Sequence, residues 1–454
     1  MKKRGWLFLL LLVLIALTGV LGSLLMTTRQ PLPYYHLMLN AARRMEQGLA
    51  AIREEKIRLG IPINQEEDRH LSGVIGAASS PITTTLGPLA AKRSSAMPDT
   101  AALCARLLNE AGLKPGERVG AVLSGSFPGL NLALLSACDA LNLECVYTVS
   151  LGSSTYGGNQ PALSAPEMMM LLYGKGLMMS PPALITPGGQ EDSGRNMLGW
   201  AFPEEARDIQ ALYERMDITR PRDYEEAVAL RKSVLGRIDC FVSVGGHDAA
   251  LGPSDSPLWT ARGLIKSPGT FSDVKEGLCA HYLARGIPVI SLLNLRGLFQ
   301  DYGLCYDPPV LPEDGQSPVY FQAHRPGWPA LLALSLCLGL LLTWHRQTRR
   351  GNSKENESMR QIPYLLGRAR EAAGKQRRVT LLLQALAMLE KDRQEEVKAS
   401  LGSSVRPLMA LRDALHEQDA DSGTGFVSQS ALDAIPDEAL ERLAHALTEQ
   451  AERG

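Results

Sequence analysis

Four short loops rich in glycine, serine and asparagine contain the groups of this chain that could bind a ligand. They occupy residues 124–129, 152–159, 245–248 and 294–297, and each follows a short apolar segment. Glycine at such points permits a positive φ or a close approach of backbone to a ligand, although the glycines are also explained by the need of the chain to turn. The candidate ligand-binding residues in these loops are Ser124, Gly125, Ser126, Tyr156, Asn159, Gly245, Gly246, Asn294 and Arg296.

Positively charged side chains add to this set of candidates. Lys92 and Arg93 follow a stretch of small residues, and Arg296 lies in the last loop. A ligand with carboxylates would need such groups for charge-assisted hydrogen bonds, and the alternative is an ordinary surface charge or helix-end contact. With 47 basic and 48 acidic residues the net charge is −1, so the chain cannot attract a polyanion broadly. Recognition of an anion must therefore be local, and no nucleic-acid partner is expected.

No recognised catalytic motif accompanies these loops. The G-x-S-x-G nucleophile elbow is absent at Ser126, and the chain has neither a G-x-x-x-x-G-K-[ST] loop nor a G-x-G-x-x-G fingerprint. On residue type alone, Ser126 as nucleophile and His247 as its base form one hypothesis, with Asp248 or Asp273 orienting the histidine. The simpler interpretation is that His247 is a solvated loop residue. The catalytic residues stay unknown, and the sequence suggests no metal and no cofactor.

The order of the apolar segments predicts an α/β fold. A strand, a tight glycine loop, an apolar helix and a second strand favour a right-handed βαβ unit with parallel strands. We therefore predict a mostly parallel open sheet within residues 65–312, with charged helices at 201–236. The expected strands lie at 119–123, 146–151, 240–244 and 287–293, and the apolar helix at 130–141.

Parallel strands would bring the four loops to one edge of the sheet. Open parallel sheets bind ligands beyond the carboxyl ends of their strands. Arg296 would hold a carboxylate there, and the N–H groups of 125–127, at a helix N-terminus, would provide a second anchor. The residues expected to line this crevice together are Ser124, Ser126, Asn159, Gly245 and Arg296.

Two apolar segments are long enough to cross a membrane. Residues 6–26 form a largely apolar run that spans about 30 Å as a helix. Residues 328–344 have a tryptophan at each end, which suits the two membrane interfaces. The alternatives are a cleaved signal peptide and a buried core helix. The first run is too long for the apolar core of a signal peptide, and basic residues directly follow the second.

The basic flanks of these segments predict the orientation of the chain. Lys2, Lys3 and Arg4 precede the first segment, and Arg346 to Arg350 follow the second. The positive-inside rule then places both termini in the cytoplasm and residues 27–327 outside it. The chain is expected to be a two-pass protein of the cell (cytoplasmic) membrane, with its main domain extracytoplasmic.

The segment after the second span is predicted to be an α-helical cytoplasmic tail. Residues 353–360 look like a polar linker, and Ser422 to Gly425 separate two amphipathic helices. The seven cysteines show no metal-binding spacing, and we predict no disulfide. The predicted divisions are a cytoplasmic N-terminus at 1–5, a transmembrane anchor at 6–26, a stalk or first helix of the domain at 27–64, the α/β domain at 65–312, a linker at 313–327, a second transmembrane helix at 328–344 and the tail at 345–454.

Several blocks of the sequence resemble a known family. They are PITTTLGPLAAKRSSAMPD at 81–99, GLKPGERVGAVLSGSFPGLNLALLSACDALNL at 112–143, the run at 150–161, and GIPVISLLNLRGLFQDYGLCYDP at 286–308. Over about residues 30–312 they resemble the poly-gamma-glutamate system protein family. The resemblance implies a membrane-anchored bacterial protein associated with poly-γ-glutamate synthesis and export, and it assigns no catalytic residues. The positions that match the family pattern are Thr84, Lys92, Arg93, Ser124, Ser126, Tyr156, Asn159, Gly245, Gly246, Asn294 and Arg296.

Three functions are consistent with these observations. The first is an accessory membrane protein of poly-γ-glutamate or capsule production, whose outer domain binds the anionic glutamyl polymer, a glutamyl end or a protein of the synthesis and export machinery. The second is an exported hydrolase or transferase acting on γ-glutamyl or cell-wall peptide bonds. The third is a transmembrane sensor whose tail relays occupancy. Two departures from the family pattern, His247 and the second span with its tail, leave the choice open.

Overall fold

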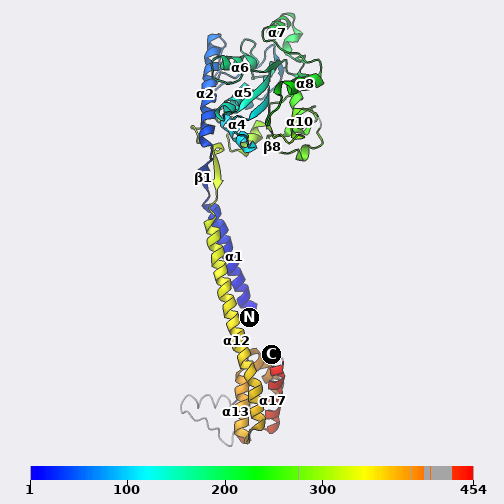
Figure 1. Cartoon of the computed structure of the whole chain (residues 1–454). Helices are drawn as coiled ribbons and strands as arrows, with labels where there is room; N and C mark the ends of the chain where they lie inside the picture. The colour runs from blue at the N-terminus through cyan, green and yellow to red at the C-terminus, as the bar shows by residue number, and fades with distance from the viewer. Residues whose placement is uncertain (1, 275, 390, 403–408, 411–431, 453–454) are drawn as a thin grey trace. The chain divides into compact units, whose positions relative to one another are not determined.

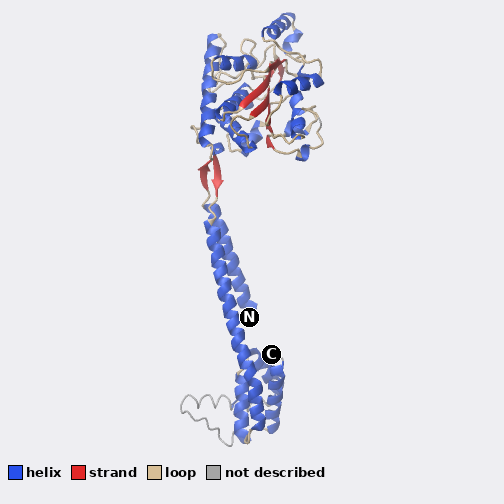
Figure 2. Ribbon diagram, viewed as in Figure 1, coloured by secondary structure: helices blue, strands red, loops and turns tan. Residues whose placement is uncertain are grey.

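The chain divides into two compact units. The computed structural model describes residues 2–274, 276–389, 391–402, 409–410 and 432–452. One unit is Thr28–His324, which we call the sheet unit, and the other is Met1–Thr27 with Arg325–Gly454, which we call the helical unit (Figures 1 and 2).

A six-stranded sheet forms the centre of the sheet unit (Figure 2). Its strands stand in the order β6-β4-β3-β7-β9-β8, and all neighbours are parallel except β8 and β9. This confirms the predicted mixed α/β fold with a mostly parallel sheet. The strands are β3 Arg118–Leu123, β4 Glu144–Ser150, β6 Leu184–Thr186, β7 Cys240–Val244, β8 Gly263–Ile265 and β9 Val289–Leu292.

Helices cover both faces of this sheet. Ala121 and Val242 belong to the larger core cluster with residues of α2, α4, α5, α6 and α11, whereas Val122 and Phe241 belong to a second cluster with α8, α9 and α10. The alternation follows from the period of two along a strand. The helices are α2 Tyr35–Arg58, α3 Leu89–Ser95, α4 Pro98–Ala111, α5 Pro128–Ala140, α6 Ala165–Gly174, α7 Pro203–Arg215, α8 Tyr224–Leu235, α9 Asp248–Leu251, α10 Leu278–Leu283 and α11 Leu295–Asp301.

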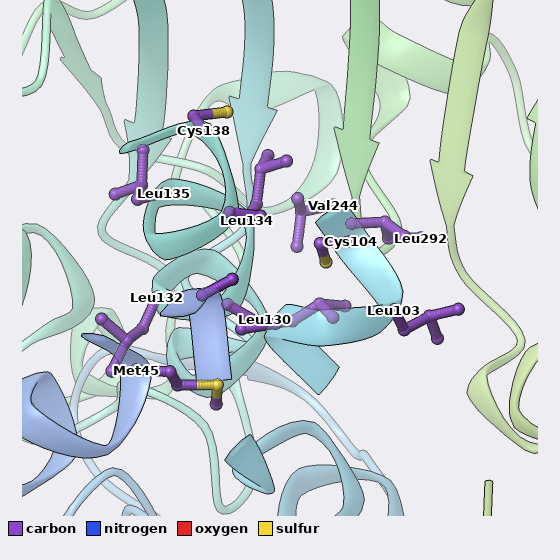
Figure 3. Packing of buried hydrophobic residues seen from close by; sticks show 14 of the residues in the cluster. Met45, Leu103, Cys104, Leu130, Leu132, Leu134, Leu135, Cys138, Val244 and Leu292 are labelled. Atoms are coloured by element: carbon purple, nitrogen blue, oxygen red, sulfur yellow. The ribbon is translucent and has the colours of Figure 1, made fainter. Parts of the chain in front are cut away.

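Helix α2 is an integral part of the larger core cluster. Its Met38, Met45 and Ile52 are fully buried, and Figure 3 shows Met45 beside Leu132 of α5. Gly48 brings the two helices close, because a Cβ at this position would lie 2.7 Å from the Leu132 side chain. Of the two roles expected for residues 27–64, the contacts fit the first helix of the domain rather than a free stalk.

Two small ladders complete the sheet unit. Strand β1 Thr28–Pro31 pairs antiparallel with β10 Phe321–His324 near the two ends of the unit. Strand β2 Thr83–Thr85 pairs parallel with the two-residue strand β5 Ser153–Ser154. The second ladder matters for the site, because it ties the segment before α3 to the loop after β4.

Two long helices in the helical unit are paired and apolar. Segments Trp6–Leu25 and Trp328–Gln347, within α1 Lys2–Leu25 and α12 Trp328–Glu371, are long and apolar enough to cross a membrane. The helices run antiparallel, because Phe8 stacks on Trp344 at 4.5 Å whereas Gly22 approaches Pro329. Gly19 also lies against Ala333, and small residues of this kind allow the close helix contacts that are common within membranes.

The remainder of the helical unit is a cluster of helices. The predicted polar linker at 353–360 is wrong, since these residues continue α12 without a break to Glu371. Leu366 of α12 packs with Leu382 of α13 and Leu443 of α17. The apolar faces of these helices are therefore buried against one another rather than exposed to solvent. The predicted separator at Ser422 to Gly425 lies outside the described residues. The further helices are α13 Lys375–Ala387, α14 Lys391–Leu401 and α17 Asp437–Glu452.

Candidate functional site

A cavity of about 820 Å³ lies at the carboxyl ends of β3, β4 and β7. Its walls come from residues within 84–92, 124–127, 150–154, 189–196 and 246–248. These are the loops that follow neighbouring parallel strands, together with the segment that β2 ties to β5. The cavity therefore occupies the edge at which open parallel sheets bind ligands.

Four of the predicted residues line this cavity, namely Lys92, Ser124, Ser126 and Gly246. Gly125 and Gly245 lie next to them in sequence and shape the loops. A Cβ on Gly125 would lie 2.7 Å from the carbonyl oxygen of Ser150, so only glycine fits between β3 and β4. Gly245 has φ of +72°, which favours glycine as the chain leaves β7.

Three other predicted residues hold the surrounding loops together. Arg93 donates two hydrogen bonds to Asp307, at 2.7 and 2.5 Å, which ties α3 to the segment after α11. Asn159 is buried, and its amide bonds both the N–H and the carbonyl of Ala77. Tyr156 has φ of +60° and lines a neighbouring hollow of about 380 Å³. The expectation that Asn159 lines the crevice is wrong, because its side chain is buried outside the cavity wall and its polar atoms bond Ala77 and Thr83.

The predicted role of Arg296 is also wrong. Asn294 has φ of +50° and begins α11, whose Leu295 and Phe299 are buried in the larger core cluster. This packing directs Arg296 away from the cavity wall, and its guanidinium lies 4.9 Å from the centre of the Tyr306 ring. Burial of apolar neighbours thus decides the direction of this loop, which strand order alone cannot specify.

His247 is buried rather than solvated. Its Nε2 lies 3.0 Å from Nη2 of Arg231 and 3.5 Å from the carboxylate of Asp192, and Arg231 pairs with the same carboxylate at 2.7 Å. Asp248 accepts a hydrogen bond from the N–H of Glu191. The hypothesis of Ser126 as nucleophile and His247 as its base has no support in the contacts of the described residues, because Ser126 Oγ accepts from the N–H of Ser154 and the carboxylate beside His247 is that of Asp192 rather than Asp248 or Asp273.

The buried group of Asp192, Arg231 and His247 was not predicted. Burial alone would raise the pKa of the Asp192 carboxyl, but the Arg231 guanidinium and the His247 imidazole outweigh that effect and hold the pKa below its usual range. Thr186 and Gly188 donate further hydrogen bonds to Asp192. The three residues come from segments far apart in sequence, and no local pattern marks them.

Lys92 is the most unusual residue of the cavity wall. Its side chain is only 2% exposed, and Nζ donates to the carbonyl oxygen of Ser126 at 2.6 Å and to Oγ of Ser154 at 2.8 Å. The amine also lies 3.5 Å from the centre of the Phe127 ring. Removal from water lowers the pKa of Lys92 to about 7.

Acidic side chains also face the cavity. Glu191, Asp248 and Glu276 line it, and Glu191 and Glu276 are exposed at its mouth. Trp259 and Tyr224 add aromatic surface. A single buried amine with several carboxylates suits a small ligand that carries both a negative and a positive group. Within the described ranges, no cluster of three or more His, Cys, Asp or Glu side chains could hold a metal ion.

Comparison of the chain with protein-family models, with curated proteins and with solved structures gave no match. The functional argument therefore depends on the residues and on the geometry described above.

Proposed function

We propose that this chain is a membrane-anchored accessory protein of poly-γ-glutamate or capsule production and export, and that its cavity binds the free end of a glutamyl chain. The cavity at the carboxyl edge of the sheet is the observation that carries the proposal. The paired apolar helices α1 and α12 support an anchor with two membrane passes. The process itself is supported by the resemblance of residues 30–312 to the poly-gamma-glutamate system proteins.

The charges of the cavity favour a chain end over the interior of the polymer. Each interior γ-glutamyl residue carries a carboxylate and no ammonium group, so Glu191, Asp248 and Glu276 would repel it. The amino-terminal residue of such a chain carries both a carboxylate and a free ammonium group. The acidic side chains would bind the ammonium group through charge-assisted hydrogen bonds, and the fraction of Lys92 that is charged would attract the carboxylate.

A binding experiment with matched oligomers tests this proposal. Short γ-glutamyl oligomers with a free or an acetylated amino terminus are titrated into the full-length protein in detergent micelles. The change in tryptophan fluorescence, to which Trp259 in the cavity wall contributes, reports binding. A lost charged hydrogen bond costs about 1.5–3 kcal/mol, so the free oligomer should bind at least about tenfold more tightly. Asp248→Asn should reduce this preference, whereas Asp255→Asn, an exposed acid outside the cavity wall, should not. Equal binding of the two oligomers, or none, contradicts the proposal.

The membrane arrangement has its own test. We propose that both termini face the cytoplasm and that the sheet unit lies outside, because basic residues flank both apolar segments. A reporter fused after residue 60 should be outside and one fused after residue 360 inside. A cytoplasmic signal after residue 60 contradicts this arrangement.

A sensor role is the second candidate, and helix α12 favours it. This helix continues for 44 residues from the apolar segment into the cluster with α13 and α17. An unbroken helix can carry a rotation or translation along its length. Removal of residues 375–454 should then leave binding of the oligomer unchanged. It should abolish the change in the amount of secreted polymer that occupancy of the cavity causes. Normal polymer production by the truncated protein would exclude this role.

A further inference from the structure

Three uncharged groups surround the amine of Lys92. Nζ contacts the carbonyl oxygen of Ser126 at 2.6 Å, Oγ of Ser154 at 2.8 Å and the face of the Phe127 ring at 3.5 Å from its centre. As an ammonium group, the amine would direct one hydrogen at each. As a neutral amine, it keeps two hydrogens for the carbonyl and the ring, and its lone pair faces the Ser154 hydroxyl. The surroundings therefore accept both protonation states.

No carboxylate neutralises this lysine in the part of the chain that the structure describes, and loss of solvent is the cause that lowers its pKa to about 7. The adjacent Arg93 on α3 is paired with Asp307 instead. A large fraction of Lys92 is therefore a neutral amine near pH 7. The ionisable groups that line the same cavity are Tyr224, Glu191, His247, Asp248 and Glu276.

Ser154 differs from the other serines of the cavity wall. The hydroxyl oxygens of Ser124, Ser126 and Ser150 accept hydrogen bonds from backbone N–H groups at 2.9–3.2 Å, whereas Oγ of Ser154 contacts the lysine amine. The β2–β5 ladder fixes the Ser154 backbone. On its other side stands Gly87, where a Cβ would lie 2.7 Å from the same Oγ. A buried hydroxyl is thus held against an amine whose pKa lies near neutral pH, in the wall of a cavity.

We propose that Ser154 and Lys92 form an acyl-transfer site, with Ser154 Oγ as the nucleophile and Lys92 Nζ as the general base. Oγ attacks the carbonyl carbon of an amide while its proton passes to Nζ. The carbon–nitrogen bond then breaks, the proton on Nζ passes to the leaving amine, and the acyl group remains as an ester on Ser154. Water attacks the ester, gives one proton to Nζ, and releases the acid as that proton returns to Oγ.

The acyl group that this site would accept is a glutamyl group, joined through an amide to an amine. This substrate class rests on the proposed function, because the charges of the cavity select it. The assignment of nucleophile and base does not, since it depends only on the contacts of Ser154 and Lys92. The two statements are therefore tested with different probes.

A fluorophosphonate, which reacts with activated serine hydroxyls, tests the nucleophile and the base. The full-length protein in detergent micelles is labelled between about pH 6 and 9, and the modified peptide is located by mass spectrometry. The adduct should be on Ser154, and its rate of formation should rise with pH to a plateau, with a midpoint near the Lys92 pKa of about 7. Lys92→Arg keeps the positive charge but removes the base, so labelling should fall about 100-fold or more. Ser254→Ala, a serine at the exposed rim of the same cavity, is the matched control and should label normally.

Several results would overturn the proposal. An adduct on Ser126 or another serine, labelling of Ser154 that Lys92→Arg leaves unchanged, or no adduct across the pH range would each refute it. Because mass spectrometry locates the adduct in the wild-type protein, the conclusion does not depend on folding of a variant. Release of p-nitroaniline from γ-glutamyl-p-nitroanilide tests the substrate class separately. Labelling without this release refutes the glutamyl substrate alone, and oligomer binding without labelling refutes the acyl-transfer site alone.

Discussion

Two buried basic side chains lie near the same cavity, and they differ in whether a carboxylate neutralises them. Arg231 is fully buried and pairs with the Asp192 carboxylate at 2.7 Å, and His247 completes the group. Lys92 is almost as buried, yet among the described residues its amine contacts a carbonyl, a hydroxyl and an aromatic ring and no carboxylate. The first arrangement fixes a charge in place, and the second leaves an amine that can give up its proton.

The choice of side chain matches each arrangement. A guanidinium stays charged at all relevant pH values, so a buried arginine requires a compensating carboxylate. A lysine can instead become neutral when it is removed from water, and a lysine of lowered pKa can then act as a general base. Arg231 thus holds the surrounding loops together through its ion pair, whereas Lys92 has the exchangeable proton that the proposed acyl-transfer site requires.

Replacing Arg231 by methionine should have the largest effect. The change leaves the Asp192 carboxylate buried and uncompensated, which costs about 3–5 kcal/mol in the free energy of unfolding. Urea unfolding of the full-length protein, followed by tryptophan fluorescence, measures the loss. Arg222→Met is the matched control, because its ion pair with Glu226 is screened by solvent and its loss should change stability far less. Similar losses for the two variants would remove the basis of the comparison.

Replacing Lys92 by methionine should change the dependence of stability on pH. Between pH 7 and 10 the unfolded lysine binds a proton that the folded one does not, so the stability of the wild-type protein relative to Lys92→Met should rise with pH. The slope is at most about 1.4 kcal/mol per pH unit, and the total between pH 7 and 9.5 is about 2–3 kcal/mol. Below pH 7 the cost of burying the charge is fully present in the wild-type protein. Parallel unfolding series at several pH values measure this difference, and a flat or falling difference would show that Lys92 stays charged.

Replacing Phe127 tests how the aromatic ring affects the pKa of Lys92. Its face stabilises the ammonium form, so Phe127→Leu should lower the pKa of Lys92 further and destabilise the folded protein by about 1–2 kcal/mol. The pH midpoint of fluorophosphonate labelling should move to lower pH. Phe202→Leu, at an exposed phenylalanine, is the control. A midpoint that moves upward would mean that the ring does not stabilise the charged amine.

Arg296→Ala should have the smallest effect. Loss of its contact with the Tyr306 ring should reduce stability by about 0.5–1 kcal/mol, with no change in oligomer affinity or in Ser154 labelling. The sequence alone predicts the reverse, a loss of carboxylate binding. Titration of the variant with the free oligomer distinguishes the two expectations. Weakened binding would show that Arg296 contributes to the binding site after all.

Part of this architecture is readable from local sequence. Apolar runs that end in glycine loops predict the four central strands, and the common edge of parallel strands brings Ser124, Ser126 and Gly246 to the cavity wall. The two edge strands β6 and β8 are only three residues long and carry no comparable signal.

The groups that matter most are brought together by tertiary packing. Lys92 and Ser154 are 62 positions apart, and Arg231 meets Thr186 across 45. Arg296 follows a strand as predicted, but the burial of Leu295 and Phe299 turns its helix elsewhere. Residue type and strand order identify the correct edge of the sheet without determining which side chains touch there.

The link between Arg93 and Asp307 has a consequence for the order of events during synthesis. Helix α3, which carries Lys92, is bound to a residue 214 positions later in the chain. At about 5–20 residues per second, the ribosome needs on the order of 10–40 s to supply that residue. The lysine and the serine emerge early, whereas the residue that fastens their helix emerges among the last of the sheet unit. A nascent chain therefore lacks this bond until Asp307 has been synthesised, and the helix that carries Lys92 is fastened only near the end of synthesis of the sheet unit.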